Sequence, residues 1–265
     1  MNIQQSQSTT HAAAAVENYF DGVLYARAYL NEVKLVDGKK GKKPYCAINA
    51  SFLEAGADGK TVYRTIDLIV RGKPAKELLW QFKDHWPANR MKREANPWLA
   101  DVNIGSIRVE AFRKRDGSTA AVLKGRLLNI RALRIGKETV HGEMSEELPQ
   151  PIFVAPCYVN EILPDKGRMK VAALDGPVSE PESFGISLEY GNNGVIAELL
   201  AMGICPKGYA NRDTNPKVFA VLEIAGLEAA VYKDNAYAKG TLQGVRFLKA
   251  DGEVIVGGEE KAAAA

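Results

Sequence analysis

The sequence predicts a mainly β protein with short helices, made of two tandem units that each follow the order β-β-β-α-β-β. Stretches of alternating apolar and polar residues, separated by turn sequences rich in glycine, lysine and aspartate, run along most of the chain. Two such sets follow one another, and short motifs recur between them, as "YLNEV" at 29–33 and "YVNEI" at 158–162 do. The chain is therefore expected to contain a tandem duplication.

The first unit opens with three expected strands, in "GVLYARAYLNEVKLV", "PYCAINASFLEA" and "TVYRTIDLIVRG". A helix is predicted next, because Leu78, Leu79 and Phe82 recur at helical spacing, with Pro74 near its first turn and Pro87 after its end. Trp80 is expected in the core beside them. Two strands around "KRDGS" complete the unit, since Asp-Gly suits the tight turn of a hairpin.

The second unit repeats this order in different residues. Strands are predicted in "IFVAPCYVNEIL", "RMKVAALDG", "SFGISLEYG", "KVFAVLEIA" and "AYAKGTLQGVRFLKA", and a helix in "GVIAELLAMGI". The segments 124–140 and 239–255 share residues at corresponding positions, including the Lys-Gly pair that opens both. In each first strand, Asn-Glu interrupts the alternation, which predicts a bend or a β-bulge.

Five strands with a helix between the third and fourth is the order of an OB-fold, a small barrel that binds oligonucleotides across its second and third strands and two flanking loops. An SH3-like barrel lacks that helix, and a β-sandwich usually needs more strands. The expected organisation is a flexible tail (1–17), a basic OB-fold-like domain (18–141), a linker (142–151), an acidic OB-fold-like domain (152–257) and a second tail (258–265).

Charge divides the chain at Ser145. The residues up to this point carry 24 lysines and arginines against 15 acidic residues, a net +9, whereas the remainder carries 11 against 17, a net −6. A basic region of this size favours a polyanion as its partner, and the acidic region would repel one.

Several classes of function find no support in the sequence. No apolar run is long enough to cross a membrane and the first residues do not resemble a signal peptide, so a cytoplasmic protein without a membrane partner is expected. Cys46, Cys157 and Cys205 are interpreted as buried free thiols. No metal-ligand spacing, phosphate-binding loop or paired carboxylate motif is present, which predicts a protein with no catalytic residues, metal or cofactor. Asp67 is interpreted as a structural hydrogen-bonding group.

Five motifs suggest a family: "YFD" (19–21), "YLNEV", the Lys/Gly run before "PYCAINA", "YRTIDLIVRG" and "LKGRLLNIRAL". Together they resemble replication proteins of bacterial integrative and conjugative elements, over about residues 19–140. The layout is more distantly similar to bacterial single-stranded DNA-binding protein. The resemblance implies an OB-like fold and a role in DNA maintenance on a mobile element, with replication or conjugation proteins of that element as partners.

The alternation predicts which side chains face a ligand. Cys46, Ile48, Ala50 and Phe52 share one face of the second strand, so Tyr45 lies on the other. Tyr63 and Arg71 fall on the outer side of the third strand by the same reasoning. Exposed tyrosines there can stack on bases, or else cover an apolar patch or a dimer seam.

Two loops that flank the expected groove are basic. The residues are Lys39, Lys40, Lys42 and Lys43 in the first, and Arg113, Lys114 and Arg115 in the second. They are interpreted as phosphate contacts, with solvated lysines as the alternative. Trp86 and Trp98, with the nearby Arg90, Lys92 and Arg93, are also expected to contact nucleic acid. The two tryptophans are interpreted either as stacking platforms or as structural plugs.

The leading hypothesis is a non-enzymatic, sequence-tolerant single-stranded DNA-binding protein for replication or transfer of a mobile element. Its first domain would bind DNA and its second would serve assembly or recruitment. The alternative is a tandem-barrel adaptor between proteins without direct nucleic-acid binding, and an RNA-binding module is the third possibility. A homo-oligomer is a further possibility, because barrels of this kind often pair through strand edges, which the sequence does not identify.

Overall fold

A computed structural model of the 265-residue chain describes residues 19–38, 43–56, 60–87, 96–208, 211 and 214–257. Strands dominate these residues, and two short α-helices accompany them, which confirms the mainly β fold class. The two predicted tails, residues 1–17 and 258–265, lie outside the described residues.

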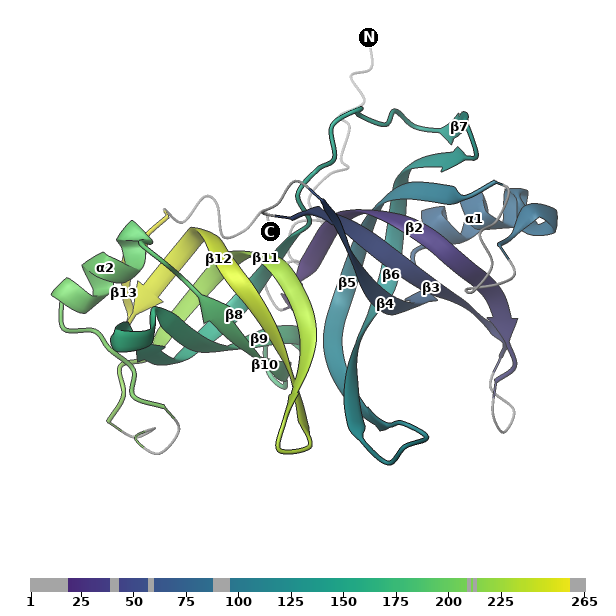
Figure 1. The fold of residues 1–265 in the computed structure, drawn as a ribbon. Coiled ribbons are helices and arrows are strands. Elements are labelled where there is room, and N and C mark those ends of the chain that lie inside the picture. The colour runs from purple at the N-terminus through teal and green to yellow at the C-terminus, as the bar shows by residue number, and fades with distance from the viewer. Residues whose placement is uncertain are drawn as a thin grey trace, which may run out of the picture.

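The first half of the chain forms a closed barrel of five strands (Figure 1). Its elements are β2 (Val23–Val36), β3 (Tyr45–Ala55), β4 (Thr61–Val70), α1 (Lys73–Gln81), β5 (Trp98–Arg113) and β6 (Thr119–Ile135). Strand β2 pairs with β3 and β5, β3 pairs with β4, and β5 pairs with β6, all antiparallel, while β4 and β6 pair in parallel and close the ring. The predicted helix occupies its predicted place, and Pro74 lies in its first turn.

The second half repeats these pairings. Its elements are β8 (Ile152–Leu163), β9 (Arg168–Pro177), β10 (Glu182–Glu189), α2 (Gly194–Ala201), β11 (Val218–Tyr232) and β12 (Asn235–Ala250). Strand β8 pairs with β9 and β11, β9 with β10 and β11 with β12 in antiparallel fashion, and β10 pairs with β12 in parallel. These pairings also run in a ring.

Short elements extend this frame. They are β1 (Tyr19–Phe20), β7 (Glu138–His141), β13 (Glu253–Val256) and the 3₁₀ turns η2 (Lys83–His85) and η3 (Pro164–Lys166). Strand β1 pairs with β9, so the start of the first half completes an edge of the second. Strands β7 and β13 each turn back on the preceding long strand, β6 and β12 respectively.

The core lies inside the two rings, and the alternation predicted its composition. Cys46, Ile48, Ala50 and Phe52 of β3 are all buried. On β4, Ile66, Leu68 and Val70 are buried as well. Period-2 alternation directs these side chains to the interior, so the opposite side chains of β3 and β4 form the outer face.

The recurring Asn-Glu motifs have the predicted bulges. The register of β2 against β3 shifts between Leu30 and Glu32, and that of β8 against β9 shifts between Val159 and Glu161. The extra residue bends each first strand, which allows it to pair with a different neighbour on either side. The repeated motif therefore has a structural cause.

Two further contacts are the same in both halves. The residue that ends each motif donates its backbone N–H to a proline carbonyl after the helix: Val33 to Pro87 and Ile162 to Pro206, at 2.9 Å each. The Lys-Gly pairs also correspond. A Cβ at Gly125 would lie 2.7 Å from Ile104 Cγ2, and one at Gly240 would lie 2.6 Å from Ile224 Cγ2. Only glycine fits such close approaches, which explains the identity at this position.

The two halves contact each other directly. Strand β2 pairs with β8 over three residues from Val23 to Tyr25. The β5–β6 and β11–β12 hairpins project side by side at the junction (Figure 1), where Thr119 Oγ1 donates to Asp234 Oδ1. Arg64 Nη1 also lies 2.9 Å from Glu228 Oε2 across the junction. The hairpin of the first half is thus held against that of the second.

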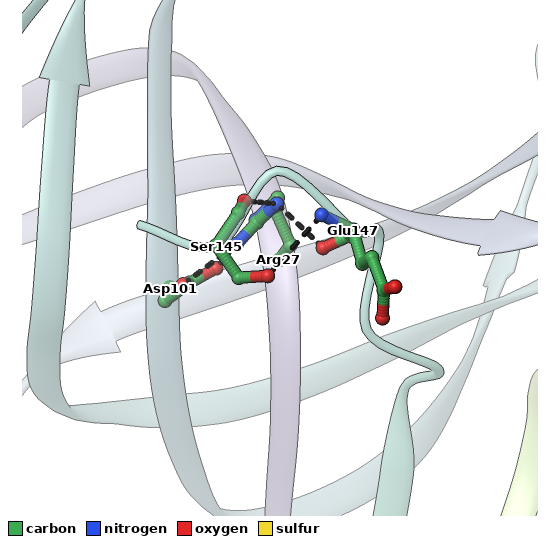
Figure 2. A network of polar contacts seen from close by, with 4 residues as sticks. All are labelled: Arg27, Asp101, Ser145 and Glu147. Atoms are coloured by element: carbon green, nitrogen blue, oxygen red, sulfur yellow. Dashed lines mark hydrogen bonds and ion pairs between the residues drawn. The ribbon is translucent and has the colours of Figure 1, made fainter. Parts of the chain in front are cut away.

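The segment predicted as a linker is tied to the first barrel (Figure 2). Arg27 is 5% exposed, and its guanidinium donates to both carboxylate oxygens of Asp101 at 2.7 and 3.0 Å. The same group donates to the backbone oxygens of Ser145 at 2.7 Å and Glu147 at 3.0 Å. One buried arginine thus anchors the start of the segment to β2 and β5.

Candidate functional site

Tyr45 and Tyr63 lie on the predicted outer face of β3 and β4, and they are 36% and 59% exposed. Tyr63 is opposite Leu53, eight residues along β3 from Tyr45. Because a strand rises by about 3.3 Å per residue, the two rings are about 26 Å apart along the sheet. They share a face but not a single stacking site.

Tyr63 instead has an aromatic neighbour on β2. The ring centroids of Tyr29 and Tyr63 are 6.4 Å apart, and the ring planes differ by 26°. This offset, nearly parallel arrangement holds Tyr63 in place and leaves most of it open to solvent. Tyr29 was missed as a site residue because its motif recurs in the second half and has a structural explanation.

A row of polar side chains crosses the face next to these rings. Asn31 Nδ2 donates to Ser51 Oγ at 2.8 Å and, more weakly, to Asn49 Oδ1 at 3.4 Å. Asn49 in turn donates through Nδ2 to Asp67 Oδ1 at 2.8 Å. The hydrogen-bonding role predicted for Asp67 is therefore present, and the bulge residue Asn31 begins the row.

A groove of about 640 Å³ runs along β4. The outer side chains of β4, including Tyr63, Thr65 and Asp67, line one wall, and Phe112 and Lys124 from the β5–β6 hairpin line another. Glu228 of β11 contributes from the second half. Phe112 is 46% exposed although it is a large apolar residue. Sequence reasoning missed Phe112, and its signal was an apolar side chain immediately before the basic hairpin turn.

Five of the predicted basic residues are described by the structure, and all five are exposed: Lys43, Arg71, Arg113, Lys114 and Arg115. None of them forms an ion pair with another described residue. The other six, Lys39, Lys40, Lys42, Arg90, Lys92 and Arg93, lie outside the described residues. The described cations are thus available to an anionic ligand.

Local hydrogen bonds shape the turn of the β5–β6 hairpin. The side chain of Asp116 accepts from the backbone N–H and the hydroxyl of Ser118, at 2.9 and 2.6 Å. These bonds lower the pKa of Asp116. Gly117 takes a φ of +82°, which suits glycine in a turn. The turn presents Arg113, Lys114 and Arg115 beside Phe112.

The two tryptophans predicted as site residues differ in burial. Trp98 is only 2% exposed, because it starts β5 between β2 and β6, and its ring meets that of Phe82 edge-on at 6.2 Å. Its assignment as a stacking residue is wrong. Trp86 is half-buried, packs edge-on against Trp80 at 5.1 Å and donates from Nε1 to the Leu79 carbonyl at 2.8 Å. It closes the end of α1, and Trp80 is itself only partly buried.

The second half carries a different exposed feature. Tyr158, Phe219 and Phe247 form an aromatic row across β8, β11 and β12, with centroid distances of 5.7 and 6.1 Å. Phe20 of β1 joins it at 5.8 Å from Phe219. Tyr158 is 46% exposed, so the row is open at one end. We name these four residues the aromatic row.

The described residues lack a metal-binding cluster, and burial leaves the Cys46 and Cys157 thiols poorly reactive. They contain no group of three or more His, Cys, Asp or Glu side chains that could hold a metal ion. Burial raises the pKa of the Cys46 thiol to about 11 and raises that of Cys157 as well, so neither is a ready nucleophile at neutral pH. All three cysteines are free, and Cys205 is only half-buried. Among the helices described, none is long and apolar enough to cross a membrane.

Residues 13–148 match the sequence family described as "Protein of unknown function (DUF3577)", which is just over half of the chain, and the chain therefore belongs to this family. The match ends shortly before β8 begins. Among curated proteins, no sequence matches the chain. Neither finding concerns integrative and conjugative elements, so the resemblance to their replication proteins stays a prediction.

The solved structures that are similar to the chain include two of a single-stranded DNA binding protein from Thermus aquaticus. One is the wild-type single-stranded DNA binding protein from Thermus aquaticus, at 12% identity and a TM-score of 0.40, with 91% of this chain and 95% of that chain covered. The other is a deletion mutant of that protein that also carries a point substitution, at 11% identity and a TM-score of 0.40, with coverage of 86% and 93%. A likeness of this degree says nothing about ligand or assembly.

Proposed function

We propose that this protein is a non-enzymatic, sequence-tolerant single-stranded DNA-binding protein whose first half holds the strand. The observation that carries the proposal is the groove along β4, where two exposed rings, Tyr63 and Phe112, share one cavity. An unpaired strand exposes flat base faces, and each base that stacks on an aromatic ring contributes about 1 to 3 kcal/mol. A double helix hides these faces.

Charge supports the same assignment. The turn that follows Phe112 presents Arg113, Lys114 and Arg115, which form no ion pairs with other described residues. Lys43 lies just before β3, on the far side of the face. Phosphates could follow these cations while bases turn inward to the rings. Contacts of this kind do not read base identity, which suits a sequence-tolerant binder.

We further propose that the chain consists of two tandem OB-fold domains, joined by residues 142–151. The two rings of pairings, the matching bulges and the end of the family match near residue 148 support this division. In such barrels the second and third strands and the adjoining loops bind oligonucleotides. Here these are β3, β4 and the β5–β6 hairpin.

The second domain is proposed to serve assembly or recruitment. The specific observation that favours protein contact there is the aromatic row, because aromatic residues are enriched at protein interfaces and Tyr158 leaves the row open at one end. A homo-oligomer, or a complex with replication or conjugation proteins of a mobile element, would use such a surface. The second candidate function for the whole chain, an adaptor between proteins, rests on the same row.

Titration of a fluorescein-labelled, mixed-sequence 30-mer tests the proposal. We expect affinity to fall about 50-fold between about 50 and about 200 mM salt if four phosphates are contacted, because binding releases counterions. The same sequence as a duplex should bind much more weakly. Absent binding, or binding that salt does not affect, would favour the adaptor.

A combined variant assigns the salt dependence to the hairpin. Replacing Arg113, Lys114 and Arg115 by glutamine should lower the slope of log affinity against log salt by about 2, since each lost phosphate contact removes about 0.7. The matched control is Lys233→Gln, which removes a cation from the tip of the β11–β12 hairpin and should leave the slope unchanged.

A further inference from the structure

The groove along β4 is lined by more acidic side chains than basic ones. Two cations line it, Arg64 and Lys124, together with three carboxylates, Asp67, Glu110 and Glu228. Both cations are already engaged: Lys124 Nζ lies 2.7 Å from Glu110 Oε2, and Arg64 Nη1 lies 2.9 Å from Glu228 Oε2. What the lining side chains still offer to a ligand is therefore mainly carboxylate oxygen, which accepts hydrogen bonds.

Arg64 is held from a second side as well. Its Nε lies 2.6 Å from Glu54 Oε2, and Glu54 is only 8% exposed. The hydrogen bonds to Glu54 and Glu228 hold the guanidinium across the junction of the two halves. This arginine is a fixed part of the wall, so it is poorly placed to turn toward a ligand.

Asp67 is positioned to meet a ligand. Asn49, which is 6% exposed, donates to Oδ1 of Asp67 at 2.8 Å and fixes the orientation of the carboxylate. The other oxygen, Oδ2, receives no hydrogen bond from a described residue. Asp67 shares the outer side of β4 with Tyr63, so an acceptor lies on the same strand as the stacking ring.

We propose that the groove selects bases that carry an exocyclic amino group, with the base stacked on Tyr63 or Phe112 and its amino group donating to Asp67. This inference rests on the proposed function and names the preference of that same site. Cytosine and adenine present an amino donor, whereas thymine presents a carbonyl acceptor at the corresponding position. A thymine carbonyl facing the carboxylate would leave two acceptors opposed.

Pyrimidine homopolymers provide the sharpest test, because cytosine and thymine have rings of the same size. The full chain is titrated with fluorescein-labelled dC and dT strands of about 20 nucleotides at pH 8, where cytosine is neutral. We expect dC to bind about tenfold more tightly, the scale of one well-placed base contact. Equal affinities would overturn the preference and leave single-strand binding intact, whereas failure to bind either strand would overturn both.

Asp67→Asn assigns the preference to its residue. The amide keeps an oxygen for the bond from Asn49 and replaces the free acceptor by a donor, so the ratio of dC to dT affinity should fall to about twofold or less. The control is Glu77→Gln on α1, which removes the same charge from a residue that does not line the groove. It should raise both affinities alike. An unchanged ratio in the folded Asp67→Asn protein would contradict the assignment.

Discussion

Tyr29 and Tyr158 occupy equivalent positions in the first strands of the two halves, yet their surroundings differ. Across the neighbouring strands, the row through Tyr29 ends in the exposed Thr65 of β4. The row through Tyr158 contains Ala172 and then Gly185, which has open space where a side chain would be. The same backbone thus places polar side chains on the strands after the tyrosine in the first half and small residues there in the second.

Positions that line the groove in the first half likewise hold smaller side chains in the second half. By register, Tyr63 corresponds to Ser183 and Asp67 corresponds to Ser187. Charge is reversed at another position: Arg108, opposite Lys124, corresponds to Glu228, which is opposite Lys239. Residues that the halves share maintain the barrel, and residues that they do not share distinguish their surfaces.

The largest expected effect concerns stability. Pro156 and Val221 of the second half stand where the first half has the buried pair Arg27 and Asp101. Arg27→Met should lower the free energy of unfolding by about 3 to 5 kcal/mol, because it leaves a buried carboxylate without its partner. Urea denaturation followed by circular dichroism measures this change.

Arg168→Met is the matched control in the second half. Its partner is Glu189, and both side chains are more than half exposed, so the loss should stay below about 1 kcal/mol. Similar losses in the two variants would show that the buried network is not what distinguishes the stability of the halves.

The next effect concerns binding. Tyr63→Ala should weaken single-stranded DNA binding by about 1 to 3 kcal/mol, or roughly 5- to 150-fold, since one stacking surface is lost. The ring is 59% exposed, so its removal should leave the fold intact. Fluorescence anisotropy gives the affinity. Tyr158→Ala removes an exposed ring from the second half and should have no effect, and equal losses would place the strand across both halves.

The smallest effect concerns the junction. Asp175 of β9 has a buried Oδ1 without a hydrogen-bond partner among the described residues. Burial raises its pKa and Asp21 and Glu182 add to the rise, whereas a hydrogen bond from Ser106 and the charge of Arg126 oppose it. The folded state therefore retains the proton more strongly than the unfolded state. Stability attributable to this group falls as pH rises from the unfolded pKa through the folded pKa, and the loss persists above it.

Asp175→Asn should remove that loss, with a gain below about 1 kcal/mol at pH 7 and none below the unfolded pKa. Thermal melts at pH 7 and at a pH below the unfolded pKa measure this gain in stability. Asp116→Asn serves as the opposite control, because hydrogen bonds from Ser118 lower the pKa of Asp116 in the folded state. Its contribution is present above the unfolded pKa, so this variant should not gain stability at pH 7.

Several elements could be predicted because their causes are local. Alternation along β3 and β4 decides which side chains face inward, since a strand has a period of two. Pro74 in the first turn and apolar residues at helical spacing were sufficient to predict α1. The two Asn-Glu bulges interrupt that alternation within a few residues, so the sequence alone also predicts where the strands depart from regular pairing.

Other features depended on partners that are distant in sequence. Trp98 lies between a proline and a strand, a context that fits either exposure or burial, and its pairing with Leu30 and Ile135 buries it. The composition of residues 142–151 predicted a linker, but no local pattern showed that Arg27 anchors this segment from 118 residues upstream of Ser145. Phe112 became a site residue only because its hairpin turns toward β4.

The sequence by itself determined the strand order, the position of the helices, the inward faces and the duplicated bulges, because each of these follows from the spacing of residues within one segment. Only the tertiary structure decided that Tyr63, Asp67 and Phe112 share one groove and that Glu228 of the second half also lines it. A groove is formed where side chains from separate strands converge, and that convergence depends on barrel closure and on the contact between the halves rather than on any local pattern.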